Sequence, residues 1–175
     1  IGTIADLINY RILNEKTVEK IDQKSVKTEY GKFNLILYKD LIFDETHLVL
    51  RKGKISRNSP TLVRVQQSNF FHDLLNIDEF GARWSVSDSM KKINEAGKGI
   101  ILLIDGENKK QDEFNEINAS KKKRITSPNN DPRRIGIGSQ ILRDLGVKKI
   151  KLMGSEVRYP SLSGFDLEVT EYLKK

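Results

Sequence analysis

The sequence predicts an α/β (α+β) fold with a mixed sheet, in which strands come first, helix–strand units follow, and helices pack on the sheet. Three short stretches in the first 66 residues alternate apolar and polar side chains, as half-buried strands do. Later stretches carry apolar residues at helical spacing, and the last of these runs directly into an apolar segment. A helix placed directly before a buried strand indicates an α/β unit.

The first half of the chain is predicted to contain one helix and a group of strands. Apolar residues at helical spacing predict a helix over residues 4–13, which Thr3 can cap. A polar connector is expected from Glu15 to Lys24. The alternating stretches predict neighbouring, antiparallel strands over residues 31–38, 46–53 and 60–66.

The second half changes to helical spacing after Gly81. Apolar side chains from Val86 onward share one helical face and predict a helix that stops at Gly97. The apolar run over residues 99–106 predicts a strand that is buried on both faces. In chain order, the remaining predictions are a polar helix or loop over residues 108–123, a helix over 135–146, a strand over 147–153 and a final strand over 165–169.

The composition excludes several kinds of chemistry. None of the 175 residues is cysteine, which excludes disulfides, cysteine-ligated zinc, iron–sulfur clusters and a thiol nucleophile. The two histidines, His47 and His72, form no HExxH motif, so a histidine-based zinc site would need carboxylates recruited from afar. No apolar run approaches a membrane span of about 20 residues, and no signal peptide is visible, so we expect no membrane partner and a cytoplasmic location.

The charge balance is basic. A formal net charge of +7 suits a phosphorylated ligand or nucleic acid. Part of the excess lies in the run from Lys121 to Arg124, beside a proline-containing turn, and this pattern is more typical of a solvated loop than of a binding surface. No aromatic ribonucleoprotein strand, helix-turn-helix signature or GXXG clamp is present, so we expect no nucleic-acid partner.

Asp131 and Arg133 stand on a predicted turn just before a helix N-terminus, where backbone amides favour anions. An acid and an arginine two residues apart on a turn more often form a local ion pair or a cap, and the residues alone do not decide between these interpretations. Gly136 and Gly138 are a weak dinucleotide signal without a preceding strand, and we interpret them as a tight helix start.

Residues 131–147 resemble the signature segment of GTP cyclohydrolase II, the zinc enzyme that opens the guanine ring of GTP at the start of riboflavin synthesis. Residues 30–33, 62–65 and 97–102 resemble the first strand, the phosphate-binding strand and the central strand of that family. The resemblance runs from about Thr28 to the C-terminus and implies the mixed sheet of the GTP cyclohydrolase II type.

Residues 4–11 resemble the link that follows 3,4-dihydroxy-2-butanone 4-phosphate synthase in two-domain riboflavin proteins. With the missing initiator Met, this resemblance implies the C-terminal half of such a chain, whose parent is a lyase. Residues 1–27 are then an interdomain linker helix and connector, and residues 28–175 a degenerate GTP cyclohydrolase II-like domain. The implied partners are the N-terminal synthase domain of the same chain and a second copy in a homodimer.

The family's metal ligands do not carry over. In the register of the resemblance, its three zinc cysteines correspond to Asn69, Phe80 and Ala82, and these offer at most one neutral amide oxygen, a poor zinc ligand. We therefore expect zinc to be absent and no cofactor in this domain, and magnesium is an expectation only for the missing synthase domain. The former cleft is expected to be filled by aromatic side chains, namely Phe70, Phe71, Phe80 and Trp84.

Other functional positions survive in part. The resemblance assigns Arg64 to the phosphate-binding strand, and Glu107 and Lys109 to the loop that cradles the triphosphate. Asp131 corresponds to the family's proposed base and Arg133 to its proposed nucleophile. We interpret all five as vestigial.

These losses favour a catalytically degenerate domain, a pseudoenzyme, with a structural or dimerisation role. Two alternatives stay open. The basic residues could still hold a phosphorylated small molecule as a regulatory ligand, or Asp131 and Arg133 could support residual metal-independent hydrolysis of GTP. Activity as GTP cyclohydrolase II is not expected, because metal-activated water supplies a large part of the rate enhancement of metal-dependent hydrolases.

Overall fold

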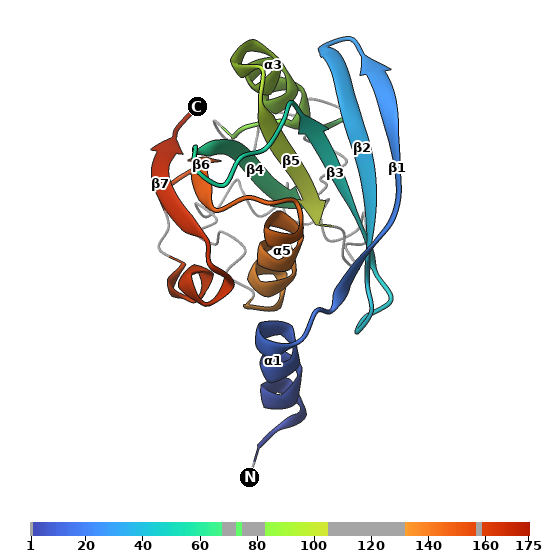
Figure 1. Cartoon of the computed structure of the whole chain (residues 1–175), viewed down its shortest axis with the longest axis vertical. Coiled ribbons are helices and arrows are strands. Elements are labelled where there is room, and N and C mark those ends of the chain that lie inside the picture. The colour runs from blue at the N-terminus through green and yellow to red at the C-terminus, as the bar shows by residue number, and fades with distance from the viewer. Residues whose placement is uncertain (1, 68–72, 75–82, 105–131, 157–158) are drawn as a thin grey trace, which may run out of the picture.

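The computed structural model describes residues 2–67, 73–74, 83–104, 132–156 and 159–175 (Figure 1). Within these residues, seven strands form one sheet in the order β1-β2-β3-β5-β4-β6-β7. In chain order the elements are α1 (Ile4–Asn14), β1 (Val18–Thr28), β2 (Gly31–Asp40), β3 (Thr46–Lys52), β4 (Thr61–Gln67), α3 (Val86–Ala96), β5 (Gly99–Ile104), α5 (Pro132–Asp144), β6 (Lys149–Met153), the 3-10 helix η2 (Pro160–Phe165) and β7 (Glu168–Leu173).

The sheet is antiparallel on one side and parallel on the other, which confirms the predicted mixed α/β fold. β1, β2, β3 and β5 pair in antiparallel fashion, whereas β5, β4, β6 and β7 pair in parallel. The expectation that β4 continues the antiparallel group is wrong, because β4 lies between β5 and β6. The chain passes through α3 between β4 and β5, and such a crossover brings the next strand back parallel to the previous one.

The expected polar connector is also wrong, because Val18–Thr28 forms β1 and pairs with β2. β1 is an edge strand, and only Val18 among its residues is buried. Polar side chains suit both faces of such a strand, so the alternation that reveals half-buried strands is missing. The division of the chain into residues 1–27 and 28–175 stays a prediction.

The last predicted strand is displaced along the chain. Residues 165–169 alternate because Phe165 and Leu167 are buried while Asp166 and Glu168 are exposed. Phe165 ends η2, and Asp166 adopts a left-handed conformation with φ 58°. A turn that buries every second residue therefore resembles a strand in sequence, and β7 itself begins at Glu168.

Helices cover both faces of the sheet. α5 packs over a core that includes Tyr38, Val49 and Leu102, whereas Ile93 of α3 packs with Phe33 in the core of the opposite face. Figure 1 shows α5 in front of the sheet and α1 projecting away from it beyond one end. No helix in the described part of the chain is long and apolar enough to cross a membrane.

The predicted cap at Thr3 and the predicted stop at Gly97 are confirmed, whereas the helix predicted over residues 135–146 spans Pro132–Asp144, so Arg133 lies in its first turn and not on a turn before it. Thr3 caps α1 through a reciprocal capping box with Asp6. α3 ends at Gly97, whose φ of 71° lies in the left-handed region that glycine adopts without steric cost. These signals act over a few residues, which is why the sequence alone reveals them.

Candidate functional site

Arg133 lies in the first turn of α5 and is engaged by the loop between β2 and β3. Its guanidinium forms an ion pair with Glu45, and the two side chains are 27% and 19% exposed. The centre of the guanidinium also lies 3.6 Å from the centroid of the Phe43 ring, within the range of a cation–π contact. The position that resembles the family's nucleophile is therefore held between an acid and an aromatic ring.

The next residue fastens the same helix end to the sheet. Arg134 donates a hydrogen bond to the side-chain oxygen of Gln67, the last residue of β4. The start of α5 is thus held to both the β2–β3 loop and the C-terminal end of β4.

Arg64 lies on the other face of the sheet. Its neighbours Val63 and Val65 contribute to the core under α5, so alternation along β4 directs Arg64 toward the α3 face. Its guanidinium donates hydrogen bonds to the backbone oxygens of Met153, at 2.9 Å, and Trp84, at 3.2 Å. The structure therefore does not bring Arg64 and Arg133 together in one site.

Burial lowers the pKa of Arg64 to about 10, while the charge of Asp73 acts in the opposite direction. Gln66 connects the two residues, because it accepts a hydrogen bond from Arg64 at 2.9 Å and donates to the carboxylate of Asp73 at 3.0 Å. Asp73 is a polar partner that the sequence reading does not identify, since no motif marks it. The network ties β4 to the segment before α3.

Several predicted site residues lie outside the described residues. They include Asp131, both loop positions and all three former zinc positions, so every prediction about them stays a prediction: Asn69, Phe80, Ala82, Glu107, Lys109 and Asp131. Phe70 and Phe71 also lie outside the described part. Trp84 packs against the core under α3 and donates a hydrogen bond to the backbone oxygen of Leu173 at 3.0 Å.

The far end of α5 holds the junction between α1 and β1. The side-chain oxygen of Gln140 accepts a hydrogen bond from the backbone of Thr17 at 2.8 Å, and its amide nitrogen donates to the backbone oxygen of Ile12. Asp144 accepts hydrogen bonds from Tyr38 and Lys16, both at 2.7 Å. Burial, followed by the bond to Asp144, raises the pKa of Tyr38.

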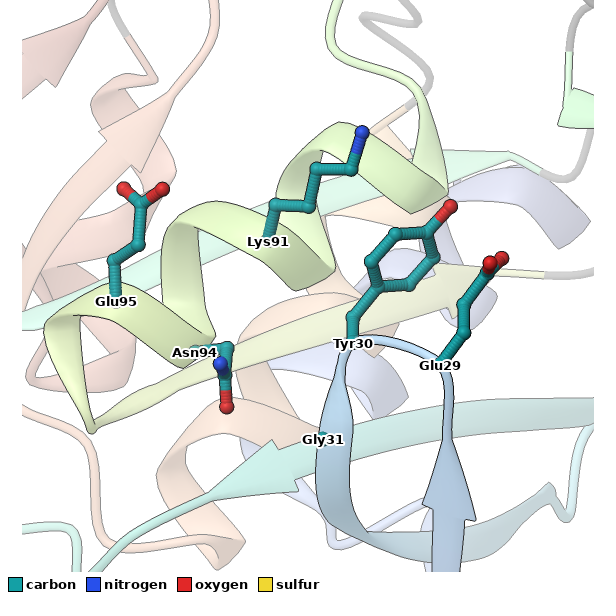
Figure 2. Close-up of a pocket in the computed structure, with 6 residues that line it drawn as sticks. All are labelled: Glu29, Tyr30, Gly31, Lys91, Asn94 and Glu95. Carbon is teal, nitrogen blue, oxygen red and sulfur yellow. The ribbon is translucent and has the colours of Figure 1, made fainter.

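A shallow hollow of about 430 Å³ lies between the β1–β2 turn and α3 (Figure 2). Its walls carry both signs of charge, with Glu29 and Glu95 on opposite sides and Lys91 between them over the ring of Tyr30. Arg64 and Arg133, the predicted site residues that the structure describes, do not line it. The hollow offers no concentrated charge and no enclosed apolar surface, so its chemistry selects no ligand class.

The structure defines an α/β domain with a mixed sheet and a helix whose first turn carries two engaged arginines. The sequence matches the family model for GTP cyclohydrolase II over residues 19–174. The chain belongs to the GTP cyclohydrolase II family.

Relatives and one solved structure extend the comparison. The chain is 43% identical over 179 residues to a 3,4-dihydroxy-2-butanone 4-phosphate synthase of Pseudomonas aeruginosa, which covers 99% of this chain and 48% of that protein. It is 35% identical over 184 residues to riboflavin biosynthesis protein RibBA of Aquifex aeolicus, and this match covers 97% of this chain and 45% of that protein. It is also similar to the crystal structure of RibBX, a two-domain 3,4-dihydroxy-2-butanone 4-phosphate synthase from A. baumannii. The TM-score is 0.65 and the identity 38%, and the match covers 99% of this chain and 45% of that one. The chain spans about half the length of these relatives.

Proposed function

We propose that this chain is a catalytically degenerate GTP cyclohydrolase II-like domain with a structural role in a riboflavin biosynthesis protein, whose other half is 3,4-dihydroxy-2-butanone 4-phosphate synthase. The observation that carries the proposal is the complete absence of cysteine from a chain that matches the family over residues 19–174. A zinc site built from thiolates cannot form. The zinc ion that activates water in the family's chemistry therefore has no thiolate ligands here. Under this proposal zinc is absent from positions 69, 80 and 82, and magnesium belongs to the synthase half.

The surroundings of the two described arginines support this proposal. Arg133 is paired with Glu45 and stacked on Phe43, and Arg64 donates to two backbone oxygens on the opposite face. Groups that act on a substrate need a shared site and an open approach to it. Both side chains are instead used in contacts that join segments of this fold.

The outer surface of α1 supports a structural partner. Ile12 is buried and Ile8 is partly buried against the core, whereas Ile4, Leu7 and Tyr10 are 81%, 60% and 61% exposed. With Leu13, which is 50% exposed, four large apolar side chains are exposed on this short helix, which is typical of a surface that another protein covers. We propose that the synthase half covers it, since relatives about twice as long include a two-domain synthase. The proposal extends to a cytoplasmic homodimer of the whole protein.

Replacing Leu7 or Tyr10 by serine tests this role. In the full-length protein, either change should lower the free energy of unfolding by about 1–3 kcal/mol, because burial of a large apolar side chain contributes roughly that much. The same change in the 175-residue chain alone should have little effect, since both side chains are already exposed there. Thermal melting and synthase activity of the two proteins measure the difference.

Ile21→Ser is the matched control, because Ile21 is 51% exposed but lies on β1 rather than α1. It should leave both proteins unchanged. Equal responses of the full-length protein and the isolated chain to Leu7→Ser would refute the structural role of α1 without touching the proposed loss of catalysis.

Incubation of the chain with GTP, with and without added zinc, tests the loss of catalysis. We expect no ring-opened product in either case. A product that forms only when zinc is added would refute the proposed loss of catalysis. A zinc-independent product would establish the residual hydrolase instead.

A regulatory phosphometabolite site is the second candidate, favoured by the net charge of +7. Calorimetry with GTP and with ribulose 5-phosphate separates it from the structural role. Absence of heat at millimolar ligand excludes a sensor, whereas saturable heat would replace the structural proposal by a binding module.

A further inference from the structure

A cluster of metal-ligating side chains lies where β2 passes into β3. Asp40 ends β2, Glu45 lies on the connecting loop, and His47 belongs to β3. Each offers one ligand atom, and these atoms lie within 4.8 Å of one another, the one such group found in the described part of the chain. The loop lies at the end of the sheet from which α1 projects (Figure 1).

The hairpin geometry assembles this cluster. Tyr38 pairs with His47 across the two strands, and the backbone nitrogen of Asp40 donates to the backbone oxygen of Glu45 at 2.8 Å. Since side chains alternate along a strand, Asp40 and Tyr38 point to the same face, and His47 lies opposite Tyr38 on that face. Asp44, with φ 59°, closes the turn and leaves its own carboxylate exposed.

Asp40 provides an independent observation that indicates a ligand. Its side chain is 0% exposed. One carboxylate oxygen, Oδ1, accepts hydrogen bonds from the backbone of Ile42 at 2.8 Å and Phe43 at 3.4 Å. The other oxygen, Oδ2, is buried and has no hydrogen-bond partner in the described structure. A buried carboxylate oxygen is unfavourable unless a hydrogen-bond donor, a proton or a cation compensates it.

We propose that Asp40, Glu45 and His47 bind one divalent transition-metal ion. An imidazole with two carboxylates suits zinc, manganese, iron or cobalt, whereas magnesium and calcium prefer oxygen ligands alone. The site differs from the family's zinc site, whose positions are 69, 80 and 82, and it departs from the expectation that this domain holds no metal.

Arg133 fits this site as a partner of one ligand. A carboxylate has two oxygens, so Glu45 can bind the ion through one while its Oε2 stays paired with Arg133. Such partners fix the orientation of metal ligands. Donor atoms around tetrahedral zinc lie about 3.3–3.6 Å apart. Glu45 can adjust its position to this spacing because it lies in the loop and is only partly buried.

Titration of the untagged, chelator-treated chain tests the site. We expect one equivalent of Zn²⁺ by calorimetry, and one equivalent of Co²⁺ that produces a visible d–d absorption band and is displaced by Zn²⁺. Asp40→Asn and His47→Gln should each weaken the affinity by on the order of 100-fold or more, since even partners of metal ligands contribute about 10–100-fold.

Asp44→Asn is the matched control, because it removes a carboxylate from the same loop, and asparagine tolerates its left-handed backbone. It should bind the ion like the unaltered chain. Equal weakening in the control and the ligand variants, or no saturable binding of any of these ions, would overturn the proposal.

A measurement on the unaltered chain tests the site even if the variants fail to fold. Substoichiometric Mn²⁺ added to the ¹⁵N-labelled chain should broaden the amide signals of residues 40–47 before those of other segments. Broadening that begins elsewhere would show binding to surface carboxylates and overturn the site.

Discussion

Asp144, the last residue of α5, connects separate segments of the chain through its two oxygens. It accepts hydrogen bonds from Lys16, before β1, and from Tyr38 of β2. Burial acts to raise the pKa of Asp144, but the bonds from Lys16 and Tyr38 outweigh it and lower the pKa below its usual value. The folded protein therefore favours the ionised carboxylate more than the unfolded chain does.

Asp144→Asn should lower the free energy of unfolding by about 1–2 kcal/mol at pH 7, since a partly exposed charged hydrogen-bond pair contributes that much. The stabilisation is present above the unfolded pKa of about 3.9 and is lost as the pH falls through the lower folded value. The difference between variant and unaltered chain should therefore vanish in acid. Urea denaturation at a series of pH values measures it.

Asp166→Asn serves as the comparison for that experiment. Asp166 also pairs with lysine and arginine side chains, Lys148 and Arg57, but it is about half exposed. Its replacement should lower the free energy of unfolding by less than the replacement of Asp144 does. A loss for Asp144→Asn that stays constant from pH 7 to strongly acidic conditions would contradict the assigned linkage.

At the scale of elements, α5 depends on glycine for its close contact with α1. A Cβ atom at Gly136 would lie 2.2 Å from Ile12, and one at Gly138 would lie 3.1 Å from Ile104. Gly136 thus admits a side chain of α1, and Gly138 lets the helix approach β5. The interpretation of these glycines as a helix start is wrong, because they lie inside α5, which begins at Pro132.

Gly136→Ala should destabilise the chain by about 1–3 kcal/mol through overpacking, although alanine favours helices. In an Ile12→Ala background the clash is removed, so the same replacement should become neutral or stabilising. Thermal unfolding of the four proteins in this cycle gives the coupling between α1 and α5. Additive effects would show that the two helices do not meet at this point.

At the scale of the whole molecule, the sheet has an edge strand that discourages further pairing. β1 is an eleven-residue strand with lysines along its length, and its register shifts between Lys20 and Asp22. Charged side chains and bulges oppose the addition of another strand at a sheet edge. Among the described residues, the exposed side of α1 offers an apolar contact surface that does not depend on this edge, which is consistent with the proposed role of that helix.

Local signals determined much of the secondary structure. The cap at Thr3, the stop at Gly97 and the alternation in β2 depend on neighbours within a few residues, so each could be predicted without knowledge of the remaining chain. The absence of cysteine likewise follows from composition alone and determines which metal chemistry this chain lacks.

Only the tertiary structure decided which distant residues meet. It places Arg64 and Arg133 on opposite faces of the sheet, although the family resemblance assigns both to one vestigial site. It also brings Asp40, Glu45 and His47 together, in a pattern that no motif marks. The physical reason is that strand order, register and the exposure of β1 depend on hydrogen bonds and burial between segments far apart in the sequence, which no local pattern encodes.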